Sequence, residues 1–437
     1  MAGKKQSLIP EEKLAQALVP QDQQPYKLPK GWVWTYLLDG FAKCCDSSRK
    51  PVSASERATL KGDIPYYGAT GQVGWINDYL TNEELVLIGE DGAPFLDVLK
   101  DKAYIINGKA WINNHAHILK SYFGHIGNLY LVHYLNSFDY RGFVNGTTRL
   151  KLTQGNMKKI PIPLPPLPEQ QRIVSRIESL FTKLDAARDK LQQVLDTQEA
   201  RRAAILHEAF SGGWGTGDSE EGRVKSEEGD GLAEGTVSVP EGWNRVALGD
   251  AYDLKAGKNI KAKEISEKKD ALHPYPCYGG NGIRGYVKNS NREGLHPIIG
   301  RQGALCGNVN MADGEFYATE HAVVVTDKIP SDAIWTYYYL TYLDLNQYAT
   351  STAQPGLAVG NLNKIWIALP PLETQHKVAS ELIALYQKED AIKKAAQSAL
   401  AQIDLLKKAI LARAFRGELG TGDPEDPDVL DLLKQCR

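Results

Sequence analysis

Short runs of cationic and amide side chains are the residues of this 437-residue chain best suited to chemistry. Lysine and arginine neutralise phosphates, and arginine, asparagine and glutamine can bond the edges of bases at two points. Two such runs occupy corresponding parts of the two halves of the chain: Ser47, Ser48, Arg49 and Lys50, and Lys255, Lys258, Asn259, Lys261 and Lys263. A solvated charged loop would have the same composition, so these runs permit nucleic-acid contact without proving it.

No motif in the chain predicts catalysis. The two Pro-Pro pairs lack the preceding Asn or Asp with which amino-methyltransferases hold their target amine. Neither a Walker A motif nor G-x-G-x-x-G before a helix is present, which counts against nucleotide or S-adenosylmethionine binding. His207-Glu208 has no second histidine for a zinc site, and Asp97-Val-Leu-Lys100 is a poor match to a nuclease motif. Three further histidines recur near matching positions and are interpreted as structural: His115, His117 and His321.

The composition narrows the class of protein. A chain of this length exceeds one ordinary domain, so two or more cores are expected. The net charge of −2 gives no bulk positive field, and any nucleic-acid site must therefore be local. The five cysteines form no C-x-x-C pair, which argues against a zinc finger or a redox pair. Without a signal peptide or an apolar run of membrane length, we expect a cytoplasmic protein with no membrane contact.

Two long helices, copies of each other, must position these runs. They are predicted at about 168–210 and 373–415, where apolar residues alternate at spacings of 4 and 3, the a/d seam of helices that wrap together. The first seam comprises Ile173, Ile177, Leu180, Leu184, Ala187, Leu191 and Val194. An offset of 205 (378 − 173) carries it onto Val378, Leu382, Leu385, Glu389, Ile392, Ala396 and Ala399, and then Ile403, Leu406 and Ile410. A lone helix of roughly 60 Å would expose this seam, so the two are expected to pair.

The ends of the helices repeat as well. Proline-rich segments 160–167 and 365–372 enter them, and proline is tolerated in a first helical turn because that N–H has no partner. Segments 203–212 and 408–417 close them with Ala-Phe-x-Gly, and Gly212 and Gly417 are natural C-terminal stops. A plain structural coiled coil remains an alternative at this point.

Two globules precede the helices, and they too are copies. Short aromatic or β-branched runs alternate with glycine turns, which predicts hairpins in a strand-rich core. Segments 239–243 and 278–286 repeat 28–32 and 67–75 at an offset of 211 (239 − 28). The copies differ in the polar segments 43–63 and 254–273, and where one has Glu90 the other has Arg301. One scaffold with two polar surfaces suits the reading of two DNA sequences, or the binding of two protein ligands.

The expected fold is α+β: two strand-rich mixed globules separated by two long helices that form an antiparallel coiled coil, with a pseudo-twofold internal repeat. Short helices are predicted at 11–18, 130–135 and 429–433. The predicted segments are an N-terminal extension (1–27), a first globule (28–166), a first long helix (167–211), an acidic flexible linker (212–239), a second globule (240–371), a second long helix (372–416) and a C-terminal tail (417–437).

The ordered set of repeats resembles a known family. The entries Leu164-Pro-Pro-Leu-Pro-Glu-Gln170 and Leu369-Pro-Pro-Leu-Glu-Thr-Gln375, the Ala-Phe-x-Gly exits, and the run Ile299-Gly-Arg-Gln-Gly-Ala304 look like the specificity subunits of Type I restriction–modification systems. The resemblance covers essentially residues 28–423. It implies a noncatalytic DNA-reading subunit in which each globule is a target recognition domain for one half of a split target, and the helix pair sets the spacing.

The resemblance also implies partners and cofactors. Two modification subunits would dock on the helices and methylate adenine with S-adenosylmethionine, and motor-nuclease subunits would bring ATP and magnesium. This chain itself would hold no cofactor and no metal. Two rival classes stay open: an enzyme in its own right, and a two-headed coiled-coil scaffold for protein ligands.

Candidate residues follow for both kinds of contact. The candidate contacts with double-stranded DNA are Ser47, Arg49, Lys50, Lys61, Tyr67, Thr70, Lys258, Asn259, Lys261, Asn281, Arg284, Arg301 and Gln302. A second mixed stripe on the helices suggests partner helices. The candidate docking residues on the helices are Phe181, Leu195, Leu206, Phe210, Tyr386, Leu400, Leu411 and Phe415.

Overall fold

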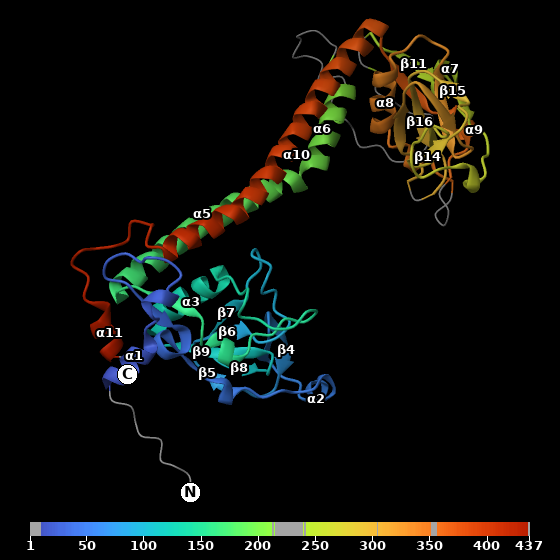
Figure 1. Ribbon diagram of the computed structural model, residues 1–437. Coiled ribbons are helices and arrows are strands. Elements are labelled where there is room, and N and C mark those ends of the chain that lie inside the picture. Colours follow the sequence, from blue (N-terminus) through green and yellow to red (C-terminus); the bar gives the residue numbers. More distant parts are fainter. Residues whose placement is uncertain are drawn as a thin grey trace. The chain divides into compact units, whose positions relative to one another are not determined.

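The computed structural model describes residues 10–211, 214, 239, 242–303, 305–350 and 356–435, and it divides into two compact units (Figure 1). The first unit is Met1–Leu191 with Gln397–Arg437, and the second is Gln192–Ala396. Each holds one globule and parts of both long helices. The predicted acidic linker lies outside the described residues, apart from its positions 214 and 239.

Two four-stranded sheets and a two-stranded sheet of the first and last strands form the globule of the first unit. Its strands are β1 (Val33–Tyr36), β2 (Ala42–Cys44), β3 (Ile64–Gly68), β4 (Gly71–Ile76), β5 (Thr81–Asn82), β6 (Leu85–Gly89), β7 (Ala103–Ile106), β8 (Lys109–Ile112), β9 (Ala116–Ser121) and β10 (Pro161–Leu164). One four-stranded sheet has the order β2-β9-β6-β7 and is antiparallel. The other has the order β4-β3-β8-β5, in which β3 and β8 run parallel.

Short helices complete this unit. They are α1 (Pro10–Ala17), α2 (Ala54–Thr59), α3 (Gly124–Ser137), α4 (Gln154–Met157), α11 (Val429–Gln435) and the single turn η3 (Asp46–Ser48). The three predicted short helices are thus confirmed as α1, α3 and α11. The C-terminal tail returns to the globule, since Val429 and Leu433 are buried in its core and Arg172 donates a hydrogen bond to the Thr421 carbonyl at 2.7 Å.

The strand β6 shows why a continuous apolar run is needed at the centre of the globule. All of its residues are buried, because alternate side chains enter two different cores. Val86 and Ile88 pack with α3 and the ends of the long helices, whereas Leu85 and Leu87 pack with Ile112 between the two sheets. The result is a helical layer over two stacked sheets.

The second unit repeats this architecture strand for strand. Its strands are β11 (Asn244–Ala247), β12 (Tyr252–Ala256), β13 (Tyr275–Gly279), β14 (Gly282–Val287), β15 (Arg292–Glu293), β16 (His296–Gly300), β17 (Val309–Ala312), β18 (Glu315–Ala318), β19 (Ala322–Asp327) and β20 (Trp366–Leu369). The sheet orders are β12-β19-β16-β17 and β14-β13-β18-β15, and β13 runs parallel to β18. The bulge between Tyr66 and Tyr67 recurs between Cys277 and Tyr278. The short helices are α7 (Leu248–Ala251), α8 (Ala333–Tyr342), α9 (Val359–Leu362) and the single turn η5 (Ala262–Glu264).

The repeated proline-rich entries have a structural reason. In each unit the entry pairs antiparallel with the first strand of the globule, β1 with β10 and β11 with β20. Gln170 then donates from Nε2 to the Pro165 carbonyl at 3.0 Å, and Gln375 does the same to Pro370 at 2.9 Å. Both glutamines are buried, so they satisfy carbonyls that proline-rich backbone leaves without partners.

The long helices are α5 (Leu167–Asp196), α6 (Gln198–Phe210) and α10 (Leu372–Phe415). The second prediction is confirmed as one helix, but the first was wrong in its continuity because the helix breaks at Thr197. Arg201 donates from Nη1 to the Val194 carbonyl at 2.9 Å, and the Thr197 hydroxyl donates to the Gln193 carbonyl at 2.7 Å. These side chains donate hydrogen bonds to carbonyl groups next to the break.

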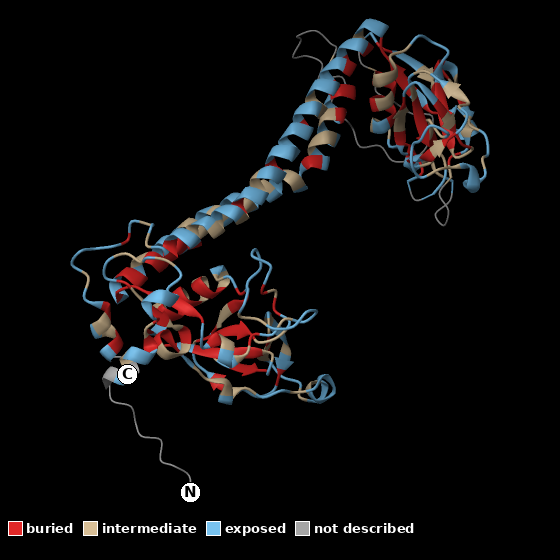
Figure 2. Cartoon of the chain, in the orientation of Figure 1, coloured by how far each residue is buried: buried red, intermediate tan, exposed pale blue. Residues whose placement is uncertain are grey.

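Ion pairs show that the helices run antiparallel. In the first unit Asp185 lies 2.5 Å from Lys407 and Arg188 pairs with Asp404, so residue numbers rise along one helix as they fall along the other. The predicted seam is only partly covered: Ile392 and Leu406 are 44% and 50% exposed. Figure 2 shows the buried residues gathered in the globules, with mostly exposed and half-buried residues along the middle of the helices. Within the described residues, no helix combines the length and apolarity needed to cross a membrane.

Candidate nucleic-acid interface

Several polar turns meet at one end of the sheets in the first unit. The Glu90 amide donates to the His115 carbonyl at 2.7 Å, which joins the turn after β6 to the turn before β9. The Asn113 amide donates to the Tyr67 carbonyl at 3.1 Å, which adds the β3–β4 hairpin. Arg49, after η3, donates to the Ala116 carbonyl at 3.1 Å. Four segments that are distant in sequence therefore present their side chains together.

The charges at this edge largely neutralise each other. Arg49 pairs with Glu90 and lies 3.2 Å from Asp46, and Lys151 lies 2.9 Å from Glu90. Burial alone would raise the pKa of Glu90, but hydrogen bonds from Lys151 and Arg49 lower it overall. Glu90 is therefore ionised and already partnered, so it adds little free negative charge to the surface.

A second polar group beside it is more open. Asp91 lies 2.6 Å from His115 Nδ1 and 2.9 Å from Arg149 Nη2, and the Arg149 side chain is 62% exposed. Thr70 is exposed on the neighbouring hairpin turn, and Tyr67 is half-buried behind it against Tyr104. Arg149 and Lys151 were missed by the sequence reasoning, because they lie in an irregular segment with no counterpart among the motifs.

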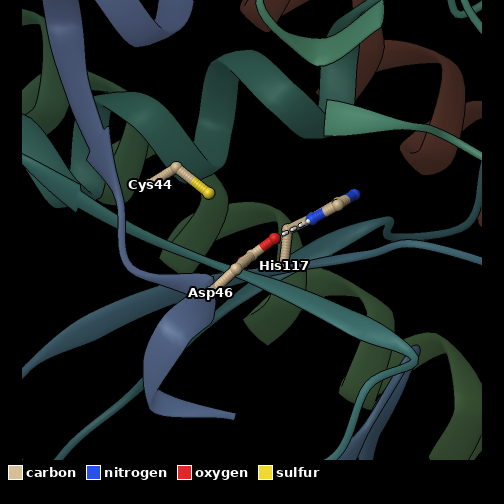
Figure 3. A group of neighbouring side chains, drawn as sticks. All are labelled: Cys44, Asp46 and His117. Atoms are coloured by element: carbon tan, nitrogen blue, oxygen red, sulfur yellow. Dashed lines mark hydrogen bonds and ion pairs between the residues drawn. The ribbon is translucent and has the colours of Figure 1, made fainter. Parts of the chain in front are cut away.

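Cys44, Asp46 and His117 form a group whose ligand atoms lie within 4.8 Å of one another (Figure 3). Both His117 nitrogens already face acceptors, Nδ1 at 2.6 Å from Asp46 Oδ2 and Nε2 at 2.8 Å from the Leu152 carbonyl. Burial raises the pKa of the Cys44 thiol to about 11, which disfavours the thiolate that a metal requires. Hydrogen bonds of Asp46 to His117 and Ile118 tie η3 to β9, and the chemistry of the group does not suit a metal.

The corresponding edge of the second unit brings together most of its predicted residues. The Lys258 amide donates to the Ala318 carbonyl at 3.0 Å, and Asn259 Nδ2 donates to Glu320 Oε1 at 3.2 Å. The Arg301 amide donates to the His321 carbonyl at 3.0 Å. Gln302 follows Arg301 and is exposed, as is Asn281 in the β13–β14 turn. Glu320 was noticed in the sequence only as part of a repeat.

Three further predicted residues lie on neighbouring elements. Lys61 precedes β3 at the end of the hairpin opposite the Thr70 turn, since Gly62 packs against Asn77. Lys261 lies at the start of η5, and Arg284 extends along β14 over Gly279. Ser47 and Lys50 are exposed beside Arg49.

The predicted docking residues are used largely inside the units. Four are buried in the cores of the globules: Leu206, Phe210, Leu411 and Phe415. Phe181 packs edge-on against His133 at a centroid distance of 5.8 Å, and Tyr386 packs against Tyr338 at 5.0 Å. Leu195 and Leu400 are half-buried. Most of the candidate docking residues thus pack the helices against their globules.

The comparisons with known proteins decide the family. The family described as Type I restriction modification DNA specificity domain matches residues 29–196 and 240–402, one copy for each globule and the helix after it. The chain belongs to this family. It is a specificity subunit of a Type I restriction–modification system, with two recognition domains.

Curated relatives agree with this assignment. The chain is 50% identical over 138 residues to the EcoprrI specificity subunit of Escherichia coli, a match that covers 32% of this chain and only 34% of that relative. It is 27% identical over 367 residues to a putative type I restriction enzyme specificity subunit of Haemophilus influenzae, covering 79% of this chain and 85% of the relative.

Solved structures show the same fold. An HsdS subunit from Thermoanaerobacter tengcongensis is 20% identical, with a TM-score of 0.60 over 91% of this chain and 100% of its own. A chain from a structure of complex assembly and conformational transition in a type I R-M system is 19% identical, with a TM-score of 0.63 over 90% of this specificity subunit and 100% of its own.

Proposed function

We propose that each recognition domain reads one half of a bipartite DNA target, and that the antiparallel helices set the spacing between the halves. One observation carries this proposal. The two globules share their strand order and even a bulge, yet the same turn holds an internally paired Glu90 in one and Arg301 in the other. A shared scaffold with different polar residues at one edge is what recognition of two unlike sequences requires.

The charge distribution supports local DNA contact. With a net charge of −2, the chain cannot rely on a general positive field, so affinity has to come from particular side chains. Lys50 and Lys258 are exposed beside the two polar edges and are placed to neutralise phosphates, which would position each domain on the duplex. The neighbouring amide and guanidinium groups would supply base contacts.

The chain itself performs no chemistry in this proposal. Two modification subunits dock on the helices and methylate adenine with S-adenosylmethionine, and motor-nuclease subunits that use ATP and magnesium join them in the cytoplasm. Exposed apolar residues of α10 offer docking positions in each unit: Leu372, Ile383 and Ile392 in the second, and Leu405 and Leu406 in the first. An exposed apolar patch is a typical mark of a protein–protein interaction site.

The test removes one heptad from α5 and the facing heptad from α10. Each helix then shortens by about 10 Å, and the gap between the half-sites should shrink by up to about three base pairs. Methylation mapping with the assembled complex measures the gap directly. If the gap between the half-sites stays the same after the deletion, the helices do not set the spacing. If the complex binds mixed duplexes without sequence preference, the chain is better explained as a scaffold for protein ligands.

A further inference from the structure

The second recognition domain concentrates buried polar atoms that have no hydrogen-bond partner. Ten such side-chain atoms occur in the described parts of the chain, and four of them lie at this one edge: Arg301 Nε, Asn310 Nδ2, Glu320 Oε2 and His321 Nδ1. A buried polar group without a hydrogen-bond partner destabilises a fold, so a native structure rarely gathers several without a ligand or water to pair them. The second domain thus gathers at this edge polar atoms for which the described residues supply no partner.

The four residues come from segments in direct contact. The Arg301 amide donates to the His321 carbonyl at 3.0 Å, so the strand end after β16 runs beside the turn before β19. The β13–β14 turn packs on both, because a Cβ added at Gly280 would lie 2.9 Å from the Gln302 carbonyl and 3.6 Å from that of His321. At Gly282 an added Cβ would lie 3.0 Å from Asn310 Oδ1, which places Asn310 beneath the same turn.

Glu320 is held in a defined orientation. Its Oε1 accepts from Asn259 Nδ2 at 3.2 Å and lies 3.3 Å from His321 Nε2, whereas Oε2 has no partner among the described residues. Arg301 stands one position from Glu320 in the strand pairing. No carboxylate in the described ranges lies within 4.0 Å of its guanidinium, nor does any described group accept a hydrogen bond from its Nε. The edge thus offers one anchored acceptor and one unpaired donor fork.

In the first recognition domain, the corresponding polar groups already have partners. Glu90, the counterpart of Arg301, is bonded by Arg49 and Lys151, and His115, the counterpart of His321, is bonded to Asp91. The common scaffold does not itself create unpaired atoms at this edge. They belong to the second domain.

We propose that Arg301 and Glu320 read the two bases of one guanine–cytosine pair in the half-site of the second domain, an inference that rests on the proposed function. In the major groove guanine offers only acceptors, N7 and O6, which match the guanidinium fork of Arg301. Cytosine offers the N4 amino group, which donates to the Glu320 carboxylate. A thymine would give Arg301 a single acceptor beside a methyl group, and a phosphate would be repelled by Glu320.

The experiment combines protein and DNA changes in the complex with the modification subunits. Once methylation mapping has given the target, each guanine of the half-sites is replaced in turn by 7-deazaguanine, which lacks the N7 acceptor, and the Kd is measured. We expect one guanine in the second half-site whose replacement weakens wild-type binding by about 10- to 100-fold, the range for one lost hydrogen bond to a charged group. The same replacement should not weaken the Arg301→Ala complex any further.

Two variants sharpen the outcome. Glu320→Gln should lose discrimination for cytosine opposite that guanine, and Lys258→Ala, a phosphate-type control, should weaken binding to all duplexes alike and reduce its salt dependence. The assignment is supported if each variant unfolds at a near-normal temperature and only the wild-type complex discriminates the guanine–cytosine pair. The inference is overturned if every 7-deazaguanine replacement weakens wild type and Arg301→Ala equally. A wild-type complex with no sequence preference would instead overturn the proposed function.

Discussion

The rings of Phe210 and Tyr339 meet edge to face, with centroids 5.1 Å apart and planes at 83°. Phe415 and Tyr134 meet in the other unit at the same distance and the same angle. Each phenylalanine belongs to the Ala-Phe-x-Gly exit of a long helix, and each tyrosine to the helix that covers the globule. In each unit, therefore, one long helix follows the globule in sequence, and the C-terminal end of the other long helix packs against the globule.

Truncating either phenylalanine should loosen one unit selectively. Phe415→Ala should cost about 3–5 kcal/mol in the first unit, because a buried ring is lost and a cavity remains, and Phe210→Ala should do the same in the second. Hydrogen exchange should accelerate in α3 for Phe415→Ala and in α8 for Phe210→Ala. Leu99→Ala, at a side chain that is 55% exposed, serves as the control and should change neither. Equal acceleration in both units by either variant would contradict the selective grip.

Sequence reasoning predicted what periodicity and repetition encode. The pattern of Ile173 and Ile177, repeated at Val378 and Leu382, gave both long helices, and the glycine turns gave the hairpin of β3 and β4. The break at Thr197 was not predicted, because the residues around it are ordinary helix formers and the break is stabilised by Arg201 from the next turn. An apolar helix face in the sequence also does not indicate whether another helix, a globule or a partner subunit covers it.

The candidate site was predicted only in part, for a similar reason. The polar runs around Arg49 and Asn259 were recognised from residue type alone. Their partners Glu90 and Glu320 are 41 and 61 residues away, and only the folded turns bring them together. Sequence spacing cannot separate a cation that is free for DNA from one that is paired inside the domain, as Arg49 is.

The ion pair of Arg201 and Glu389 next to the helix break should contribute more to the free energy of unfolding than the exposed ion pairs between the helices. Arg201 donates to Glu389 from Nε and Nη2 at 3.1 and 2.9 Å, and Glu389 is only 8% exposed within the seam. Because Arg201 is about one-third exposed, Glu389→Ala should cost about 1–3 kcal/mol in chemical denaturation, less than for a fully buried pair.

Two further variants test that reading of the pair. Replacing both partners, Arg201→Leu with Glu389→Leu, should restore only part of the stability, because no buried charge then lacks a partner but the Val194 carbonyl loses its hydrogen bond from Arg201. The control Asp185→Asn removes an exposed partner of Lys407 and should cost at most about 1 kcal/mol. If Glu389→Ala lowers the free energy of unfolding no more than Asp185→Asn does, the burial of Glu389 does not strengthen its ion pair.

Acid should destabilise the first unit through His133. Burial against Phe181 lowers the pKa of His133 from its ordinary 6.5 to about 4. Between those values the unfolded chain binds a proton that the folded chain excludes, so stability is full above pH 6.5 and falls as the pH drops towards 4. The shift corresponds to about 3 kcal/mol at most. His133→Leu should flatten that part of the stability–pH curve, and an unchanged slope in the variant would contradict the assignment.

Assembly with the modification subunits should depend on apolar residues that the helix pair leaves uncovered. Leu405 and Leu406 are 60% and 50% exposed on α10, so Leu405→Asp or Leu406→Asp should change the free energy of unfolding by less than about 0.5 kcal/mol. A charge at the centre of a docking surface excludes a close partner, so co-purification of a modification subunit should be lost. Leu99→Asp, equally exposed but on a loop of the first globule, should assemble normally. If both α10 variants retain two modification subunits, the docking surface lies elsewhere on the chain.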